Sequence, residues 1–277
     1  MKLIINSPAK INFGLFITER RGDGFHNIET IFYPLQLCDE ITMRECDHLL
    51  IETDSVDLNL KPENNLVYKA VKLMEAQTGR EFHCRIKLIK RIPMGAGLGG
   101  GSSNAASVLL GLNDLFDLKL TKVELMLLGA QLGSDVPFFI HPVPSFGTGR
   151  GERLQPIDFE LKGELVVVNP GIHVATGPAY KNCTPHKAGF NLLELNESKY
   201  LNYNELRHSV ENTFEESVFQ NHPEIANLKN NFYENGADFS LMSGSGSTVF
   251  GIFNDKKNAE EFIKTLPQNY FVYKEEL

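Results

Sequence analysis

The chain has 277 residues and a mass of 31.1 kDa, which at roughly 150 residues per domain suits one large domain or two modest ones. Apolar residues make up 42% of it and charged residues 22%, which excludes disorder and fibrous structure as the overall class. The net charge of −8 excludes a general nucleic-acid binder, because such binding depends on Lys and Arg that neutralise phosphates.

The cysteines and the hydropathy pattern indicate the compartment. The four cysteines form no CxxC pair, so we expect reduced thiols and no structural zinc. Polar residues interrupt the N-terminal apolar stretch before a signal-peptide core develops, and no run of 18 apolar residues occurs. We therefore expect a cytoplasmic protein with no secretion signal and no membrane span.

In the first half of the chain, periodicity predicts helices around one clear strand. Residues 64–78 are predicted to form a helix that Gly79 closes. Residues 81–91 alternate between apolar and polar side chains, as a half-buried strand does. After a glycine-rich loop, the apolar spacing over 105–116 predicts a buried helix, and the capping box of Thr121 and Glu124 begins another, which ends at Gly133.

The second half resembles a β-α-β-β-α-β order with one extra helix. The predicted strands are 164–168, 238–242, 247–253 and 270–274, and the predicted helices are 204–219, 223–235 and 255–266. Residues 172–203 are rich in Gly, Pro and Asn, so we expect a long irregular loop with a functional role. A change of composition near 155–163 predicts two domains, residues 1–158 and 159–277.

The strongest chemical signal is the loop between the strand and the buried helix. Its glycines, which allow close approach of a ligand to the backbone, are Gly95, Gly97, Gly99, Gly100 and Gly101. Backbone N–H groups at the start of a helix, aided by the helix dipole, bind anions, and phosphate is the natural ligand. The alternative is a tight strand-to-helix turn with a serine cap.

Two other phosphate-binding patterns fit this loop less well. The spacing Gly95-x-Gly97-x-x-Gly100 matches the dinucleotide fingerprint formally, but no second strand ends in an acidic residue about 20 residues further on. In the P-loop pattern, Gly101 occupies the position of the lysine that meets the β- and γ-phosphates. Both classes are therefore disfavoured.

Three segments together resemble a known superfamily of small-molecule kinases, which includes galactokinase, homoserine kinase, mevalonate kinase and phosphomevalonate kinase (GHMP). These segments are 8–12, 93–103 and 242–248. Within that superfamily, three further segments resemble the branch that acts on a cytidine-diphosphate-linked methylerythritol, namely 21–26, 132–139 and 147–152. The resemblance implies a two-domain α+β fold with an N-terminal lobe like domain 2 of ribosomal protein S5, a C-terminal ferredoxin-like lobe and a cleft between them.

The resemblance also implies the reaction. ATP with Mg²⁺ would be the phosphoryl donor, and the C2 hydroxyl of the cytidyl-linked methylerythritol would be the acceptor, in the non-mevalonate route to isoprenoid precursors. Asp135 is implied as the general base, and Lys10 as the neighbour that keeps the aspartate ionised and helps to position the hydroxyl. From the residues alone, a turn or helix-cap residue is the favoured interpretation of Asp135, and a solvated surface lysine is the strongly favoured interpretation of Lys10.

The binding residues follow from the same resemblance, which gives no protein ligand for Mg²⁺. It assigns ATP binding to Pro93, Met94, Gly95, Ala96, Gly97, Leu98, Gly99, Gly100, Gly101, Ser102 and Ser103. It assigns substrate binding to Asn12, Phe25, His26, Thr176, Tyr180, Gly244 and Gly246. Phe25, which stands where tyrosine is common in the family, and Tyr180 are expected to stack on the cytosine ring, and His26 to hydrogen-bond its edge.

Two alternatives stay open from the sequence. One is a sister kinase of the same superfamily that acts on homoserine, mevalonate or a sugar, and the other is a non-catalytic protein that retains the nucleotide cleft. For partners, we expect a small-molecule substrate, no nucleic acid and no membrane, and a monomer or weak homodimer.

Overall fold

A computed structural model of the protein describes residues 2–55, 65–198 and 200–277. Packing divides the chain into two compact units that interleave along the sequence. Unit 1 comprises Met1–Lys10, Pro34–Met94 and Gly99–Pro142, and unit 2 comprises Ile11–Tyr33, Gly95–Leu98 and Val143–Leu277. The predicted boundary between residues 158 and 159 follows composition rather than packing, and it stays a prediction.

Long strands carry the chain through both units. Strand β1 (Lys2–Arg20) leaves unit 1 after Lys10, and β2 (His26–Glu45) enters unit 1 at Pro34. In unit 1, β2 pairs antiparallel with β4 (Cys84–Ile89), and β4 pairs in parallel with β3 (Leu50–Thr53). Strand β4 confirms the predicted strand, because its alternate residues from Cys84 onward are fully buried.

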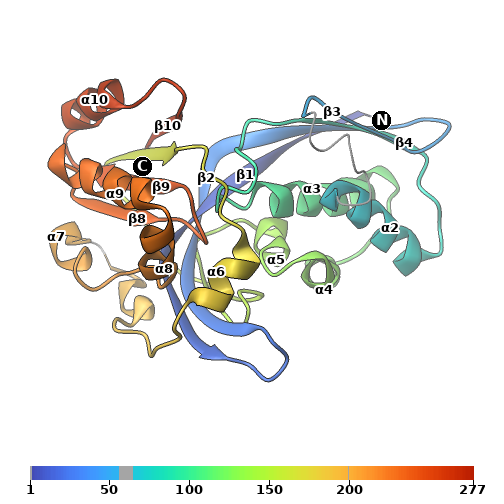
Figure 1. The fold of residues 1–277 in the computed structure, drawn as a ribbon. Coiled ribbons are helices and arrows are strands. Elements are labelled where there is room, and N and C mark those ends of the chain that lie inside the picture. The colour runs from blue at the N-terminus through green and yellow to red at the C-terminus, as the bar shows by residue number, and fades with distance from the viewer. Residues whose placement is uncertain (1, 56–64, 199) are drawn as a thin grey trace. The chain divides into compact units, whose positions relative to one another are not determined.

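The helices of unit 1 pack on one another in Figure 1. They are α2 (Leu66–Thr78), α3 (Gly100–Leu115), α4 (Lys122–Leu132) and α5 (Val136–Ile140). Gly79 ends α2 in the left-handed conformation at φ 66°, as predicted, whereas the predicted start at Asn64 lies outside the described residues. The capping box of Thr121 and Glu124 is present at the start of α4. The helices predicted from local signals are therefore confirmed.

Helix α3 is held against the strands of unit 1 through a glycine. A Cβ atom at Gly111 would lie 2.3 Å from Met43 Sδ and 2.8 Å from Ile5 Cδ1. The helix therefore approaches β1 and β2 closely at this point, and a larger residue would require the side chains of Met43 and Ile5 to move. This contact fixes the helix whose first turn follows the glycine loop.

Unit 2 contains the predicted β-α-β-β-α-β arrangement. Its strands are β7 (Glu164–Asn169), β8 (Phe239–Met242), β9 (Val249–Phe253) and β10 (Phe271–Glu276), in the antiparallel order β10-β7-β9-β8. Helix α9 (Pro223–Glu234) packs against β8 and β9, and α10 (Lys256–Thr265) against β7 and β9. Two further strands, β5 (Ser145–Thr148) and β6 (Arg153–Pro156), pair with each other, and β5 pairs with β2.

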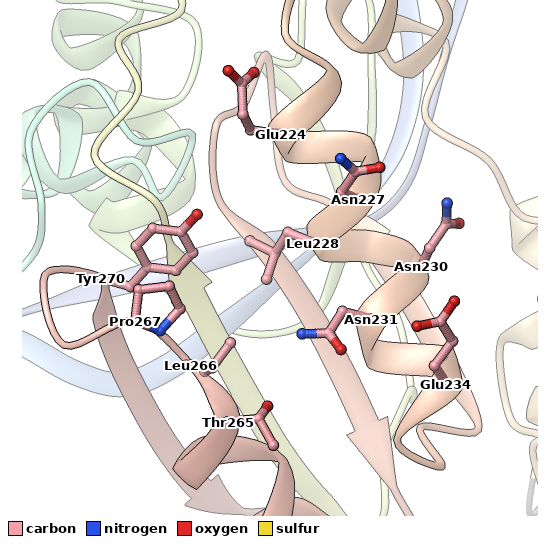
Figure 2. Close-up of a pocket in the computed structure, with 10 residues that line it drawn as sticks. All are labelled: Glu224, Asn227, Leu228, Asn230, Asn231, Glu234, Thr265, Leu266, Pro267 and Tyr270. Atoms are coloured by element: carbon pink, nitrogen blue, oxygen red, sulfur yellow. The ribbon is translucent and has the colours of Figure 1, made fainter.

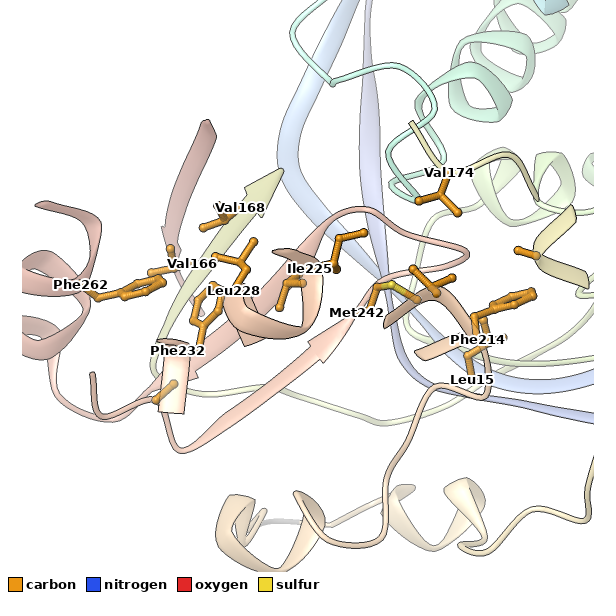
Figure 3. Packing of buried hydrophobic residues seen from close by; sticks show 14 of the residues in the cluster. Leu15, Val166, Val168, Val174, Phe214, Ile225, Leu228, Phe232, Met242 and Phe262 are labelled. Atoms are coloured by element: carbon orange, nitrogen blue, oxygen red, sulfur yellow. The ribbon is translucent and has the colours of Figure 1, made fainter. Parts of the chain in front are cut away.

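The core of unit 2 lies between the sheet and its helices, as Figure 3 shows. Ile225, Leu228 and Phe232 of α9 share one cluster with Val166 and Val168 of β7. These side chains are 4% exposed or less, so each contributes about 1.5–3 kcal/mol of burial free energy. The same cluster extends to Met242, which directly precedes the loop after β8.

Two predictions for unit 2 are wrong in detail. The helix predicted over 204–219 is two helices, α7 (Tyr203–Leu206) and α8 (Phe214–Asn221). The chain leaves the helical path between them because Asn212 donates hydrogen bonds from Nδ2 to the carbonyl oxygens of Met242 (2.7 Å) and Gly244 (2.8 Å). Tertiary hydrogen bonding overrides the local helical preference here.

The loop predicted over 172–203 is not wholly irregular. It contains α6 (Thr176–Asn182) and a 3-10 helix, η2 (Leu192–Leu195). Packing supports both elements, because Ala179 and Leu192 are buried and Leu192 lies against Gly14. The Asn191 side chain also caps η2 by accepting a hydrogen bond from the Leu193 N–H. No helix of the described residues is long and apolar enough to cross a membrane.

Candidate active site

The glycine loop has a backbone that only glycine adopts readily. Gly95, Gly97 and Gly99 lie at φ 63°, 78° and 73°, in the left-handed region. Gly99 is the N-cap of α3, and the carbonyl oxygen of Gly99 accepts a hydrogen bond from the Ser103 N–H at 2.9 Å. The sixteen-residue helix therefore starts directly after the loop, as the anion-site prediction requires.

Within unit 2, the middle of this loop packs directly on the loop after β8. A Cβ atom at Gly97 would lie 2.0 Å from the Ser243 carbonyl oxygen, and one at Gly244 would lie 3.1 Å from Gly97 Cα. The Ser243 hydroxyl donates to the Gly97 carbonyl oxygen (3.0 Å) and accepts from the Asn12 N–H (3.2 Å). Three segments that the sequence analysis singled out separately are thus in contact.

Within unit 1, the end of the loop meets an ion pair. Lys10 Nζ lies 3.5 Å from Asp135 Oδ2, and a Cβ atom at Gly99 would lie 3.1 Å from Lys10 Cγ. Asp135 stands at the N-cap position of α5, yet its side chain makes no capping hydrogen bond to that helix. The Lys10 side chain is 4% exposed and that of Asp135 is 32% exposed, so the carboxylate is accessible and the lysine is buried.

Burial sets the charge balance of Lys10. Removal from water lowers the pKa of Lys10, while the charge of Asp135 and the hydrogen bond that Lys10 donates to its carboxylate act in the opposite direction. The lysine is therefore no ordinary surface lysine. It is a buried lysine that lies beside a carboxylate at the end of the glycine loop.

The serines that follow the loop differ in their surroundings. Gly101 is exposed, Ser102 is half-buried and Ser103 is fully buried. The Ser103 hydroxyl accepts a hydrogen bond from the Ser7 hydroxyl at 2.8 Å. The first turn of α3 therefore presents Gly101 and Ser102 outward and uses Ser103 inside the unit.

The predicted cytosine-binding residues of unit 2 form a partly exposed aromatic group. The rings of His26 and Tyr180 stack with centroids 5.1 Å apart and an interplanar angle of 21°. Phe25 is 50% exposed, and the Arg150 guanidinium lies 4.7 Å from the centroid of its ring. The stacking partner of Tyr180 is thus His26, and that of Phe25 is Arg150. Burial, with a smaller contribution from the charge of Arg20, lowers the pKa of His26 and favours a neutral imidazole.

The remaining predicted substrate-binding residues also lie in unit 2. Asn12 is buried, and its Nδ2 donates to the Thr30 hydroxyl at 2.9 Å. The hydroxyls of Thr176 and Ser245 lie 3.1 Å apart, which joins α6 to the loop after β8. Gly244 and Gly246 both have a positive φ, as their place in that tight loop requires.

Sequence reasoning missed Arg150 and His173. Arg150 lies inside the segment 147–152, whose glycine spacing carries the resemblance but indicates no role for the arginine. His173 Nδ1 would lie 3.3 Å from a Cβ atom at Gly95, so its ring packs on the start of the glycine loop. No periodic or motif signal marks His173.

A separate hollow in unit 2 contains none of the predicted site residues. It lies between α9 and the connection from α10 to β10, with Leu228 at its floor and Tyr270 and Pro267 on one side (Figure 2). Half of its lining residues are Asn or Glu, and none of them belongs to the glycine loops.

Comparison with known proteins gives the class first. The family model described as "GHMP kinases N terminal domain" matches residues 65–142, and the one described as "GHMP kinases C terminal" matches residues 192–272. A crystal structure of mevalonate kinase from Methanococcus jannaschii is 13% identical with a TM-score of 0.74, and covers 100% of this chain and 99% of its own, which shows the fold. The fold and the glycine loops are those of a GHMP kinase, which confirms the predicted α+β class and the prediction of an ATP-dependent small-molecule kinase.

More similar relatives define the family. A 4-diphosphocytidyl-2-C-methyl-D-erythritol kinase of Bacteroides thetaiotaomicron is 41% identical over 261 residues, which are 91% of this chain and 93% of the relative. A crystal structure of 4-(cytidine 5'-diphospho)-2C-methyl-D-erythritol kinase is 31% identical, with a TM-score of 0.81 and coverage of 98% of each chain. The chain belongs to the 4-diphosphocytidyl-2-C-methyl-D-erythritol kinase family.

Proposed function

We propose that this protein transfers the γ-phosphoryl group of ATP to the C2 hydroxyl of 4-diphosphocytidyl-2-C-methyl-D-erythritol, in the non-mevalonate route to isoprenoid precursors. One observation carries the proposal: in unit 1, the Lys10–Asp135 pair lies against Gly99, where the glycine loop becomes helix α3. An anion-binding helix start and an accessible carboxylate beside it are the two parts that phosphoryl transfer to an alcohol needs.

Asp135 is the proposed general base. Its carboxylate takes the proton of the attacking hydroxyl while the hydroxyl oxygen bonds to the γ-phosphorus and the bond to the ADP oxygen breaks. The Lys10 ammonium, 3.5 Å away and buried, holds this carboxylate in place and adds positive charge where negative charge develops. The other contributions are positioning of the two reactants and backbone N–H donors from the start of α3.

The donor set fits a Mg²⁺ ion that arrives with the nucleotide. Among the described residues, no group of three or more His, Cys, Asp or Glu side chains is placed to hold a metal. Mg²⁺ keeps several waters and is commonly held by substrate phosphates with one or two carboxylates. The triphosphate and water would therefore supply most of the ligands of such an ion. The ion would neutralise charge on the triphosphate.

Unit 2 is proposed to recognise the cytidyl group. Phe25 offers a half-exposed ring face, and Tyr180 and His26 offer a stacked pair with a polar edge. Arg150 beside Phe25 adds a cation suited to a diphosphate. The relatives' names, which specify a diphosphocytidyl substrate, support this assignment.

Three further statements stay predictions. They are the monomeric or weakly dimeric state, the cytoplasmic location and the division into residues 1–158 and 159–277. The first is checked by sedimentation velocity over a range of concentrations. The second is checked by fractionation of the source cell, and the third by expression of each segment alone.

The acceptor is tested by coupled ADP release with ATP and Mg²⁺. The cytidyl-linked methylerythritol is compared with mevalonate, homoserine and galactose at equal concentrations. We expect release with the cytidyl substrate alone, and thermal protection of the protein by CMP through linkage. Turnover of another alcohol without CMP protection would assign the chain to a sister kinase and overturn the proposed substrate.

A further inference from the structure

A buried carboxylate in unit 1 joins the segments on either side of the glycine loop. Asp39, on β2, is 0% exposed. Its Oδ1 accepts hydrogen bonds from the backbone N–H groups of Arg91 (2.7 Å) and Ile92 (2.9 Å), just before the loop. Its Oδ2 accepts from Lys90 Nζ and from Asn104 Nδ2 (2.8 Å), in the first turns of α3. One side chain thus contacts both ends of the loop.

The network continues from Asn104 to Ser7 and to Ser103 in the first turn of α3. Asn104 Nδ2 also donates to the Ser7 hydroxyl (3.0 Å), and Asn104 Oδ1 accepts from Lys90 Nζ (3.1 Å). The Ser7 hydroxyl donates to Ser103 Oγ at 2.8 Å. Ser7, Ser103 and Asn104 are all 2% exposed or less. Every hydrogen bond of this network lies inside unit 1.

Burying such a network costs desolvation free energy, so stability alone does not explain its presence. A buried carboxylate is tolerated only with a cation and hydrogen-bond donors, and an apolar replacement of the whole group is often as stable. The glycine loop has few side chains of its own, and three of its glycines are left-handed. In unit 2 the Ser243 hydroxyl holds the middle of the loop at the Gly97 carbonyl oxygen, whereas in unit 1 the loop is held at its ends. Asp39 is the group that binds the chain at both ends, at Arg91 and Ile92 before the loop and at Asn104 after it.

We propose that Asp39 is a positioning residue for the nucleotide loop: it fixes Arg91 and Ile92 relative to Asn104, and so sets where the N–H groups at the start of α3 meet the triphosphate. The inference rests on the proposed function for its ligand, a nucleoside triphosphate with Mg²⁺. Asp39 is fully buried and acts through the backbone around it. Its loss therefore weakens the affinity for ATP and leaves recognition of the cytidyl group unchanged.

The test is the affinity for ATP with Mg²⁺, measured by calorimetry on Asp39→Asn and on a matched control. The amide still accepts from Arg91 and Ile92, but its N–H₂ group faces the donors Lys90 and Asn104. Because a displacement near 1 Å has large effects on aligned groups, we expect ATP affinity and the KM for ATP to worsen at least about tenfold, with CMP affinity unchanged.

The control is Glu164→Gln, which removes another buried carboxylate paired with two lysines. Glu164 is 5% exposed and lies near Lys256 and Lys274 in unit 2. We expect a lower Tm for this variant and unchanged ATP affinity. Equal losses of Tm in the two variants with unchanged ATP affinity in both would overturn the positioning role.

Two further variants keep the test decisive. Lys90→Gln added to Asp39→Asn supplies an acceptor for the new amide, and we expect it to restore part of the ATP affinity. If Asp39→Asn does not fold, Ser7→Ala removes one hydroxyl from the same network, and we expect ATP affinity to fall about threefold. Unchanged affinity in Ser7→Ala would then contradict the proposal. Failure of the wild type to phosphorylate the cytidyl substrate would overturn the proposed function and leave the ATP-binding comparison valid.

Discussion

Replacement of Gly97 by alanine tests the contact between the two glycine loops. Gly97 lies at φ 78°, where a residue with a Cβ atom costs about 1–2 kcal/mol. The added Cβ would lie 2.0 Å from the Ser243 carbonyl oxygen, so the backbone must shift. That shift breaks the hydrogen bond from the Ser243 hydroxyl to the Gly97 carbonyl oxygen, worth about 1 kcal/mol more. We expect the free energy of unfolding to fall by about 2–4 kcal/mol.

The matched control lies four residues further on, in the same glycine cluster. Gly101 is helical, and a Cβ atom there would meet Leu66 Cδ1 at an ordinary 3.6 Å. Alanine favours a helix over glycine, so Gly101→Ala should raise the free energy of unfolding by up to about 1 kcal/mol. Urea denaturation followed by circular dichroism measures both variants. Unchanged stability in Gly97→Ala, or an equal loss in Gly101→Ala, would refute the reasoning.

Three further predictions concern titration and substrate recognition. Burial raises the pKa of Cys84 to about 12 from 9.0, so its neutral thiol stabilises the fold fully below pH 9 and less as pH rises towards 12. Between pH 9 and 12, urea titrations should show that the free energy of unfolding of the wild type falls by up to about 1.4 kcal/mol per pH unit relative to that of Cys84→Ala. Parallel plots of this free energy against pH for the two proteins would contradict the prediction. Burial lowers the pKa of Lys10, so in a plot of activity against pH the alkaline decrease should begin below the ordinary lysine range. This alkaline decrease should be absent from the residual activity of Lys10→Met. If the variant shows the same decrease, it belongs to another group. Tyr180→Ala should raise the KM for the cytidyl substrate about tenfold with the KM for ATP unchanged, whereas Tyr200→Ala, at a side chain 83% exposed, should change neither; a rise in both KM values would count against base recognition.

The sequence predicts elements whose signals are local. Gly79 and the capping box at Thr121 mark helix ends because a left-handed glycine and a reciprocal cap act within a few residues. Strand β1 has no comparable signal, since most of its residues from Ser7 onward are buried without alternation. The break before α8 is set by Asn212, whose partners lie about 30 residues away in the chain.

For the candidate site, too, local signals are predictable from the sequence and long-range contacts are not. Motifs predict the glycine loop and the residues before and after it, because several glycines close together indicate a backbone that a ligand approaches closely. The pairing of Lys10 with Asp135 joins residues far apart in the chain, so no spacing rule reveals it without a resemblance. Asp39 carries no motif at all, and its role emerges only where the fold brings it to the backbone of Arg91 and Ile92. Long-range polar contacts are what local patterns leave out.

The most direct test of the account is the turnover of Asp135→Asn with ATP, Mg²⁺ and the cytidyl-linked methylerythritol, beside ATP binding in the same preparation. The amide keeps the size of the side chain and removes the base, so kcat should fall more than about a hundredfold while ATP affinity stays within about threefold of wild type. A variant that retains kcat would contradict Asp135 as the base. Loss of ATP binding with kcat would instead assign the residue to nucleotide binding.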